Sequence, residues 1–379
     1  MWTSVALGLV FGFVAESNLE QRPGRKGGRR EAPGSHPGCG PGPDAAQATP
    51  LLLVHVMPWF EAPPQSKNYG FHWTMDKAEP PKSWASHFQP SFGLYDSLDR
   101  RVIEAQVALI KTAGFDGILA DWYGPDDALD YGMIHPPTLL LFEVVRKAGL
   151  KFGVVWEDQT IGQRIRLAGL PADQTKATAE RAIRYVAETW AKDPLFLRLK
   201  GKPSLLVFGP QTLKDEEWPT TLMVEAGLQL LTLHHRRGPA VGAFDWPLPS
   251  VGVTPALGRM ERDAKDWPVW IATAFPRFKD WYQEAGIGPG YGEIKDDGGL
   301  TYRKTLERGI RSGAAAVQVA TWNDWGEGTQ IEPSQEFGLR DLIATQELRR
   351  KWIDPGFKYK ASDLEKILKN FAAQPAERR

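Results

Sequence analysis

The sequence predicts an α/β fold of one domain, a (β/α)8 TIM barrel in which eight parallel strands close into a cylinder surrounded by helices. Short apolar runs alternate with amphipathic segments from residue 50 onward, and strands that alternate with helices pair in parallel. Eight such units in roughly 300 residues favour a closed barrel over an open doubly wound sheet. No glycine-rich phosphate loop follows the first apolar run, so a nucleotide-binding sheet is the weaker alternative.

The eight strands are expected at short, mostly uncharged runs, which are typical of buried strands. They lie at 51–56, 116–121, 151–157, 203–208, 228–233, a less clear sixth at 240–246 or 250–254, 268–273 and 314–320. Segments with helical periodicity lie between the strands. Examples are RVIEAQVALIKTAG, which ends on Gly114, TLLLFEVVRKAG, which ends on Gly149, and residues 175–190. Glycine takes the left-handed conformation that closes a helix, so both glycines are expected to end helices.

The 379 residues divide into three predicted parts. Residues 1–17 hold an apolar stretch that is too short to span a bilayer and is typical of a signal peptide. Residues 18–49 are rich in Gly, Pro and Arg without periodicity, which predicts a disordered linker or a start assigned too early. Residues 50–379 form the predicted catalytic barrel. We therefore expect a secreted or periplasmic protein without an integral membrane segment.

The amino-acid composition narrows the kinds of molecule that the protein is expected to bind. Lys and Arg number 46, as do Asp and Glu, so no strong field attracts nucleic acid, and a neutral ligand is expected. The 15 tryptophans suit sugar rings, although most tryptophans in proteins are core residues. Cys39 is the single cysteine, which excludes a disulfide framework and a thiolate metal site. His234 and His235 are adjacent and would point to opposite faces of a strand, so no metal or other cofactor is expected. We expect a monomer.

Polar and aromatic residues gather where the predicted strands end. In a barrel the catalytic side chains stand at these carboxyl ends. The ends read HVMPWF, ADWYGP, WEDQT, FDWP and TWNDWGEG. Acids and aromatic rings gathered at one rim indicate a polar cleft that binds rings.

Asp324 and Glu327 lie three positions apart in the last of these ends. Cleavage of an acetal requires one carboxylic acid to protonate the leaving oxygen and one carboxylate to act as base or nucleophile. Flanking tryptophans would raise the pKa of one acid and keep it protonated near neutral pH. The alternative is that Asn323 and Asp324 begin a helix and Glu327 completes a capping box.

The stretch WNDWGEGTQIEP resembles the hallmark of glycoside hydrolase family 99, the endo-α-mannosidases. That family has Glu in place of Asp324 and typically His in place of Gly326. TWND and GE are also similar to the α-1,3-glucanases of family 71, and related barrel proteins of polysaccharide gene clusters, some labelled glycosyltransferases, share these features. PWF at 58–60, HW at 72–73, YDSLD at 95–99, DWYGP at 121–125 and FGLRDL at 337–342 follow the pattern, so the resemblance spans about 51–353.

The resemblance implies roles for individual residues. Glu327 corresponds to the general acid and Asp324 to the general base, which in family 99 deprotonates the sugar 2-hydroxyl. Asp is one methylene shorter than Glu, about 1.5 Å, which leaves room for a water and puts the stereochemistry in doubt. Glu157 aligns with a substrate-binding acid, and Glu332 is expected to tie the loop to a basic group.

The remaining predicted substrate-binding residues come from the strand ends and from two connecting segments. They are Trp59, His72, Trp73, Asp121, Trp122, Tyr123, Tyr302, Trp322, Asn323 and Trp325. The sequence thus predicts a glycoside hydrolase that cleaves α-linked mannan-type or glucan-type oligo- or polysaccharides without a cofactor. The alternatives are a glycosyltransferase or transglycosylase of polysaccharide metabolism, and a non-catalytic sugar-binding barrel.

Overall fold

The computed structural model describes residues 49–125, 134–167, 169–171 and 173–373. The predicted signal peptide at 1–17 lies outside these residues, as does the predicted linker at 18–49 except for Thr49. Both remain predictions, as does the secreted location. In the part of the chain that the structure describes, no helix is long and apolar enough to cross a membrane.

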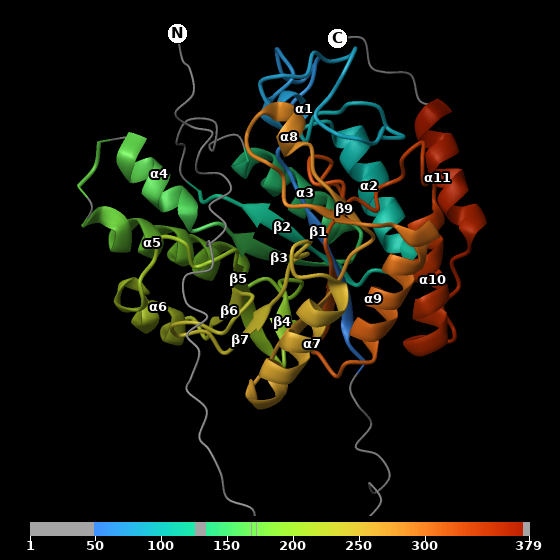
Figure 1. Cartoon of the computed structure of the whole chain (residues 1–379). Helices are drawn as coiled ribbons and strands as arrows, with labels where there is room; N and C mark the ends of the chain where they lie inside the picture. The colour runs from blue at the N-terminus through green and yellow to red at the C-terminus, as the bar shows by residue number, and fades with distance from the viewer. Residues whose placement is uncertain (1–48, 126–133, 168, 172, 374–379) are drawn as a thin grey trace, which may run out of the picture. The chain divides into compact units, whose positions relative to one another are not determined.

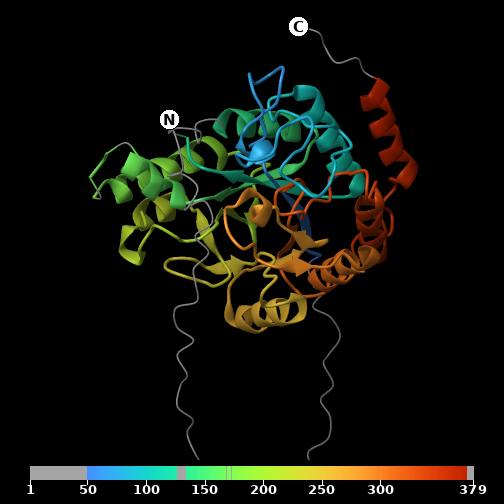
Figure 2. The same ribbon diagram turned by 45° about the horizontal axis from the view of Figure 1, so that its top comes forward.

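The predicted barrel is confirmed, and Figures 1 and 2 show helices arranged around its strands. Neighbouring strands follow the order β7-β6-β5-β3-β2-β1-β11-β8, and each ladder along this path is parallel. The strands are β1 Leu51–Val56, β2 Gly117–Trp122, β3 Lys151–Trp156, β5 Lys202–Val207, β6 Gln229–Leu233, β7 Gly242–Phe244, β8 Ile271–Ala274 and β11 Ala316–Val319. β4 Arg198–Leu199 pairs antiparallel with β5, and β9 Phe278–Lys279 with β10 Glu293–Ile294.

Side chains bridge the two ends of this strand order, β7 and β8. Thr273 Oγ1 donates to the backbone carbonyl of Asp245 at 2.9 Å and accepts from the backbone N–H of Asp245 at 3.3 Å. Gln318 Nε2 donates to the same carbonyl at 2.8 Å. These three bonds join the segment after β7 to β8 and β11, so the cylinder is nearly closed.

The helices follow the expected alternation with the strands. They are α1 Phe71–Thr74, α2 Arg100–Ala113, α3 His135–Lys147, α4 Gln159–Leu167, α5 Gln174–Tyr185, α6 Thr220–Glu225, α7 Val253–Asp263, α8 Tyr282–Ala285, α9 Leu300–Ile310, α10 Arg340–Trp352 and α11 Ala361–Ala373. Shorter turns lie at Val186–Trp190, Asp215–Glu217, Ala264–Asp266 and Asp297–Gly299. Gly114 closes α2 at φ 100°, as its sequence position predicts. The sixth strand lies within 240–246, whereas 250–254 enters α7.

Successive side chains of each strand point alternately into the barrel and toward the helices. Leu53, Leu119 and Val155 belong to the inner apolar layer. Their neighbours Val54 and Ala120 belong to the outer layer, beneath the helices. The next inward residues, His55, Asp121 and Glu157, lie two positions further along and therefore enter the cleft at the carboxyl ends of the strands.

Candidate active site

The segment after β11 forms a tight turn that holds Asp324 and Glu327 together. Thr321 Oγ1 accepts from Asp324 N at 2.8 Å, and Asp324 Oδ1 accepts from Glu327 N at 3.0 Å. The second bond is the contact that a capping box would make, but no helix follows it. Gly328 has φ 66°, and a Cβ there would lie 2.6 Å from the Lys279 carbonyl oxygen. This close approach requires glycine.

Glu327 is buried between two donors from other parts of the barrel. The Trp246 Nε1 donates to Oε2 at 3.1 Å, and the Tyr282 hydroxyl donates to Oε1 at 3.3 Å. Burial, with the neighbouring charge of Asp324, raises the pKa of Glu327 well above its usual range. This shift favours the protonated form of Glu327.

Asp324 is the second buried carboxyl group of this turn. Burial raises its pKa to about 7, against the opposing effect of the backbone N–H groups of Glu327 and Gly326. Because these amides favour the ionised carboxylate, Asp324 is suited to change its charge near neutral pH. Two neighbouring carboxyl groups with different hydrogen-bond partners suit one acid and one base.

Two further acids enter the cleft from neighbouring strands. Asp121, in β2, and Glu157, directly after β3, are both buried. Burial raises the pKa of both, with Asp324 adding to the shift of Asp121 and Asp121 to that of Glu157. Gln159 Nε2 donates to Glu157 Oε2, so a neutral amide, and not an arginine, is its partner among the described residues.

The segment after β1 contributes a pair of stacked rings. Trp59 and His72 lie 3.9 Å apart at an interplanar angle of 5°, and both are half-buried. Trp73, in contrast, is fully buried and its Nε1 donates to the Tyr95 carbonyl at 2.8 Å. Trp59 and His72 are thus placed to meet a ligand, whereas Trp73 supports the segment that carries them.

Asn323 and Trp325 hold the turn from beneath. Asn323 Oδ1 accepts from Met57 N at 2.8 Å and its Nδ2 donates to the Met57 carbonyl at 3.0 Å, which ties the end of β1 to the turn that carries Asp324 and Glu327. Trp325 is fully buried, and its Nε1 donates to Glu332 Oε2 at 3.0 Å. Both residues therefore position the site by contacts within the protein.

Trp122, Trp322 and Tyr302 do not reach the cleft, which corrects the expectation that they line it. All three are fully buried in the outer layer, between strands and helices. Trp122 follows the inward Asp121 and must point outward, where it packs against Trp190 at 5.1 Å. Tyr302 lies in α9, and its hydroxyl shares a hydrogen bond of 2.8 Å with Thr345. Tyr123, at the end of β2, is nearly buried at 9% exposure.

Glu332 is structural, but its expected basic partner is absent from the described residues. Its oxygens accept instead from Tyr95 at 2.8 Å, Gln106 at 2.6 Å and Trp325 at 3.0 Å. Burial raises its pKa to about 8, against the opposing effect of these three hydrogen bonds. Glu332 supports the turn from beneath through these contacts.

Sequence reasoning missed His55, Trp246 and Tyr282 as members of the site. His55 and Trp246 stand in the strand ends HVMPWF and FDWP, and inward alternation could have selected them. Tyr282 opens the short helix α8, and no local pattern marks it. Among the described residues, no three His, Cys, Asp or Glu side chains are placed to hold a metal ion.

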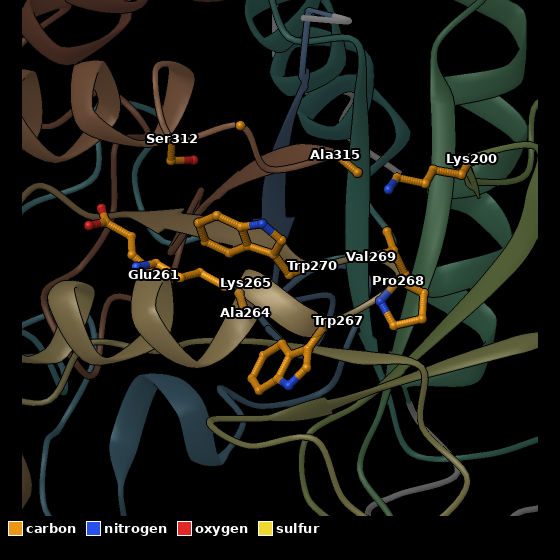
Figure 3. Close-up of a pocket in the computed structure, with 11 residues that line it drawn as sticks. Lys200, Glu261, Ala264, Lys265, Trp267, Pro268, Val269, Trp270, Ser312 and Ala315 are labelled. Atoms are coloured by element: carbon orange, nitrogen blue, oxygen red, sulfur yellow. The ribbon is translucent and has the colours of Figure 1, made fainter. Parts of the chain in front are cut away.

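A separate pocket of about 260 Å³ opens at the other end of the barrel, at the start of β8 and β11 (Figure 3). Trp267 and Trp270 line it with Lys200 and Lys265. Its single carboxyl group, Glu261, pairs with Arg308 at 2.6 Å. Because acetal cleavage requires two carboxyl groups, this pocket is not the catalytic site.

The (β/α)8 barrel carries two buried carboxyl groups on the turn after its eighth strand. This combination is what a glycosidase requires. No family model matches the chain. A glycoprotein endo-alpha-1,2-mannosidase-like protein of Danio rerio is 21% identical over 337 residues, covering 77% of this chain and 72% of that protein. The glycoprotein endo-alpha-1,2-mannosidase of Rattus norvegicus is 22% identical over 305 residues, covering 70% and 60%.

Solved structures agree on the fold. The family 99 (GH99) endo-alpha-mannosidase of Bacteroides thetaiotaomicron superposes with a TM-score of 0.62 at 19% identity, covering 79% of this chain and 97% of that one. Its complex with Bis-Tris propane gives 0.63 and 20% identity, covering 80% and 97%. The chain is therefore a family 99-like barrel, as its motifs predicted. Its likeness to family 71 remains a prediction.

Proposed function

We propose that the protein is a glycoside hydrolase that cleaves α-linked mannan-type glycans, with Glu327 as general acid and Asp324 as general base. The observation that carries the proposal is the pair of buried carboxyl groups on one turn, where Trp246 and Tyr282 donate to Glu327 and Asp324 accepts from the Glu327 N–H. The names of the similar proteins support mannose as the sugar. Glucan-type substrates are the second choice.

The reaction assigns one proton transfer to each residue. Glu327 gives its proton to the glycosidic oxygen as the bond from that oxygen to the anomeric carbon breaks. Asp324 takes a proton either from the sugar 2-hydroxyl, whose oxygen then attacks the anomeric carbon, or from a water that attacks the opposite face. The first route retains the anomeric configuration after a second step with water, and the second inverts it.

The partners of Glu327 fit its change of charge. Hydrogen bonds from Trp246 and Tyr282 favour the carboxylate that remains after the proton leaves. They stand in place before the reaction, in a site where water is largely excluded, so they stabilise the developing charge without reorganisation. Trp59 and His72 offer a stacked aromatic face for a neighbouring sugar ring.

The test is reducing-end release from α-mannans, α-1,2-linked mannooligosaccharides and α-1,3-glucan by the parent protein, Glu327→Gln and Asp324→Asn. We expect losses of at least about 100-fold for either substitution, and no loss for Glu347→Gln, an exposed acid on α10. NMR of the first product anomer decides between the two routes for Asp324. Binding without release would identify a sugar-binding barrel, and product that forms only with a nucleotide sugar would identify a transferase.

A further inference from the structure

Two inward side chains at the floor of the cleft face each other without touching. His55 of β1 is fully buried, and neither ring nitrogen has a hydrogen-bond partner among the described residues. Oδ2 of Asp121, in β2, also has none. His55 Nε2 and Asp121 Oδ1 are 3.9 Å apart, which is too long for a direct hydrogen bond. Buried polar atoms without partners are costly, so a third polar group between them would satisfy both.

This gap lies beside the catalytic pair. The His55 ring packs edge-to-face on Trp246, with 4.9 Å between ring centroids, and the Trp246 indole holds Glu327 at 3.1 Å. On the other side, Asp324 is close enough to raise the pKa of Asp121, after the larger effect of burial. A sugar whose glycosidic oxygen reaches Glu327 therefore lies over the gap.

The dimensions of the gap match one hydroxyl group. An oxygen placed about 2.8 Å from both His55 Nε2 and Asp121 Oδ1 fits their 3.9 Å separation. The angle at this oxygen between the two atoms is then roughly 90°, which two hydrogen bonds at one oxygen can adopt. Burial lowers the pKa of His55 to about 3, so its ring is neutral and offers one N–H donor. A hydroxyl can accept from this donor and give its own proton to the carboxyl group of Asp121.

We propose that His55 and Asp121 form a hydroxyl-binding pair that recognises one free hydroxyl of the sugar whose bond is cleaved. This inference rests on the proposed function and refines it. The substrate carries an unsubstituted hydroxyl at that position, and sugars that are deoxygenated or substituted there are rejected. A site built to bond a hydroxyl discriminates strongly against the analogue that lacks it, because its own polar groups are then left unpaired.

The test measures binding, so that it does not depend on turnover. Calorimetry compares methyl α-1,2-mannobioside with analogues that lack the 3-, 4- or 6-hydroxyl of the non-reducing mannose, on the Glu327→Gln protein. We expect one analogue to bind at least about 10-fold more weakly. In Glu327→Gln combined with His55→Phe, or with the isosteric Asp121→Asn, this difference should fall below about 2-fold. His235→Phe, at an exposed histidine, is the matched control and should preserve it.

The outcomes separate this inference from the hydrolase proposal. Equal binding of all analogues, or a difference that survives both substitutions, overturns the hydroxyl-binding pair even if the parent hydrolyses mannan. A difference that both substitutions abolish supports the pair even if the parent releases no sugar. Failure of Glu327→Gln to bind the mannobioside and all its analogues overturns the pair for this substrate class.

Discussion

The indole N–H of Trp246, two residues beyond the end of β7, donates a 3.1 Å hydrogen bond to Oε2 of Glu327, on the turn after β11. The two residues are 81 positions apart in the chain, and barrel closure brings them together. This bond favours the ionised form of Glu327 and so lowers its pKa, against the larger effect of burial. Trp246 is therefore a positioning residue that sets both the orientation and the proton affinity of the acid.

Replacement of Trp246 by Phe removes this donor and keeps an aromatic ring. We expect the pKa of Glu327 to rise further, which moves the alkaline limb of the kcat/KM profile to higher pH, and kcat to fall about 10-fold. The pH dependence of mannan hydrolysis measures both effects. Trp267→Phe, at the other end of the barrel, should change neither. An alkaline limb at the same pH in Trp246→Phe and the parent would show that Trp246 does not set the pKa of Glu327.

The pH profile of the parent protein follows from the two raised pKa values. The base works when ionised, so kcat/KM should rise with pH through a pKa near 7, the value for Asp324. The acid works when protonated, so the rate should fall only at higher pH, where Glu327 loses its proton. These limbs belong to the coupled pair. An optimum near pH 5 would contradict the burial of Asp324.

Glu332 makes stability depend on pH. Its pKa is about 8 when folded and 4.5 ordinarily, so between these values the unfolded chain releases a proton that the folded protein keeps. This contribution is complete below the lower pH and is lost as the pH rises toward 8. Glu332→Gln cannot ionise, so its Tm relative to the parent should rise by several degrees between pH 5 and about 8.5. A constant difference in thermal melts would show that Glu332 is already ionised in the fold.

Gly328 is expected to tolerate no side chain. Alanine would hold φ 66° and place its Cβ 2.6 Å from the Lys279 carbonyl oxygen, so Gly328→Ala should cost about 2 kcal/mol or more of unfolding free energy and most of the activity. Gly288 has open space around it, and Gly288→Ala should stay within about 0.5 kcal/mol. Urea unfolding followed by fluorescence measures both variants. Equal midpoints would show that the turn relaxes around the new methyl group.

Tyr302→Phe tests the outward placement of Tyr302. The substitution removes the hydroxyl that bonds Thr345 in the outer layer, so stability should fall by about 1 kcal/mol. Because the ring does not reach the cleft, kcat/KM should remain within about 2-fold of the parent value. A loss of 10-fold or more on mannooligosaccharides, in a variant whose thermal unfolding is little changed, would return Tyr302 to the substrate-binding residues.

Local pattern was enough to predict much of the fold and the placing of two carboxyl groups on one turn. Each barrel strand overlaps an apolar run, because burial on both faces demands such a run. The pair Asp324 and Glu327 was found because both members lie on one turn. Pattern failed at Trp122, Trp322 and Tyr302, where aromatic residues near strand ends and in a loop were assigned to the cleft although they pack beneath the helices.

The sequence by itself determined the alternation of strands and helices, the nearness of Asp324 to Glu327 on one turn and the aromatic segment after β1, since each depends on neighbours in the chain. Tertiary structure alone decided that Asp121 faces the cleft while Trp122 faces away, that Trp246 and Tyr282 hold Glu327, and that His55 stands opposite Asp121. These relationships join residues from different strands. They depend on register and barrel closure, which no local pattern encodes.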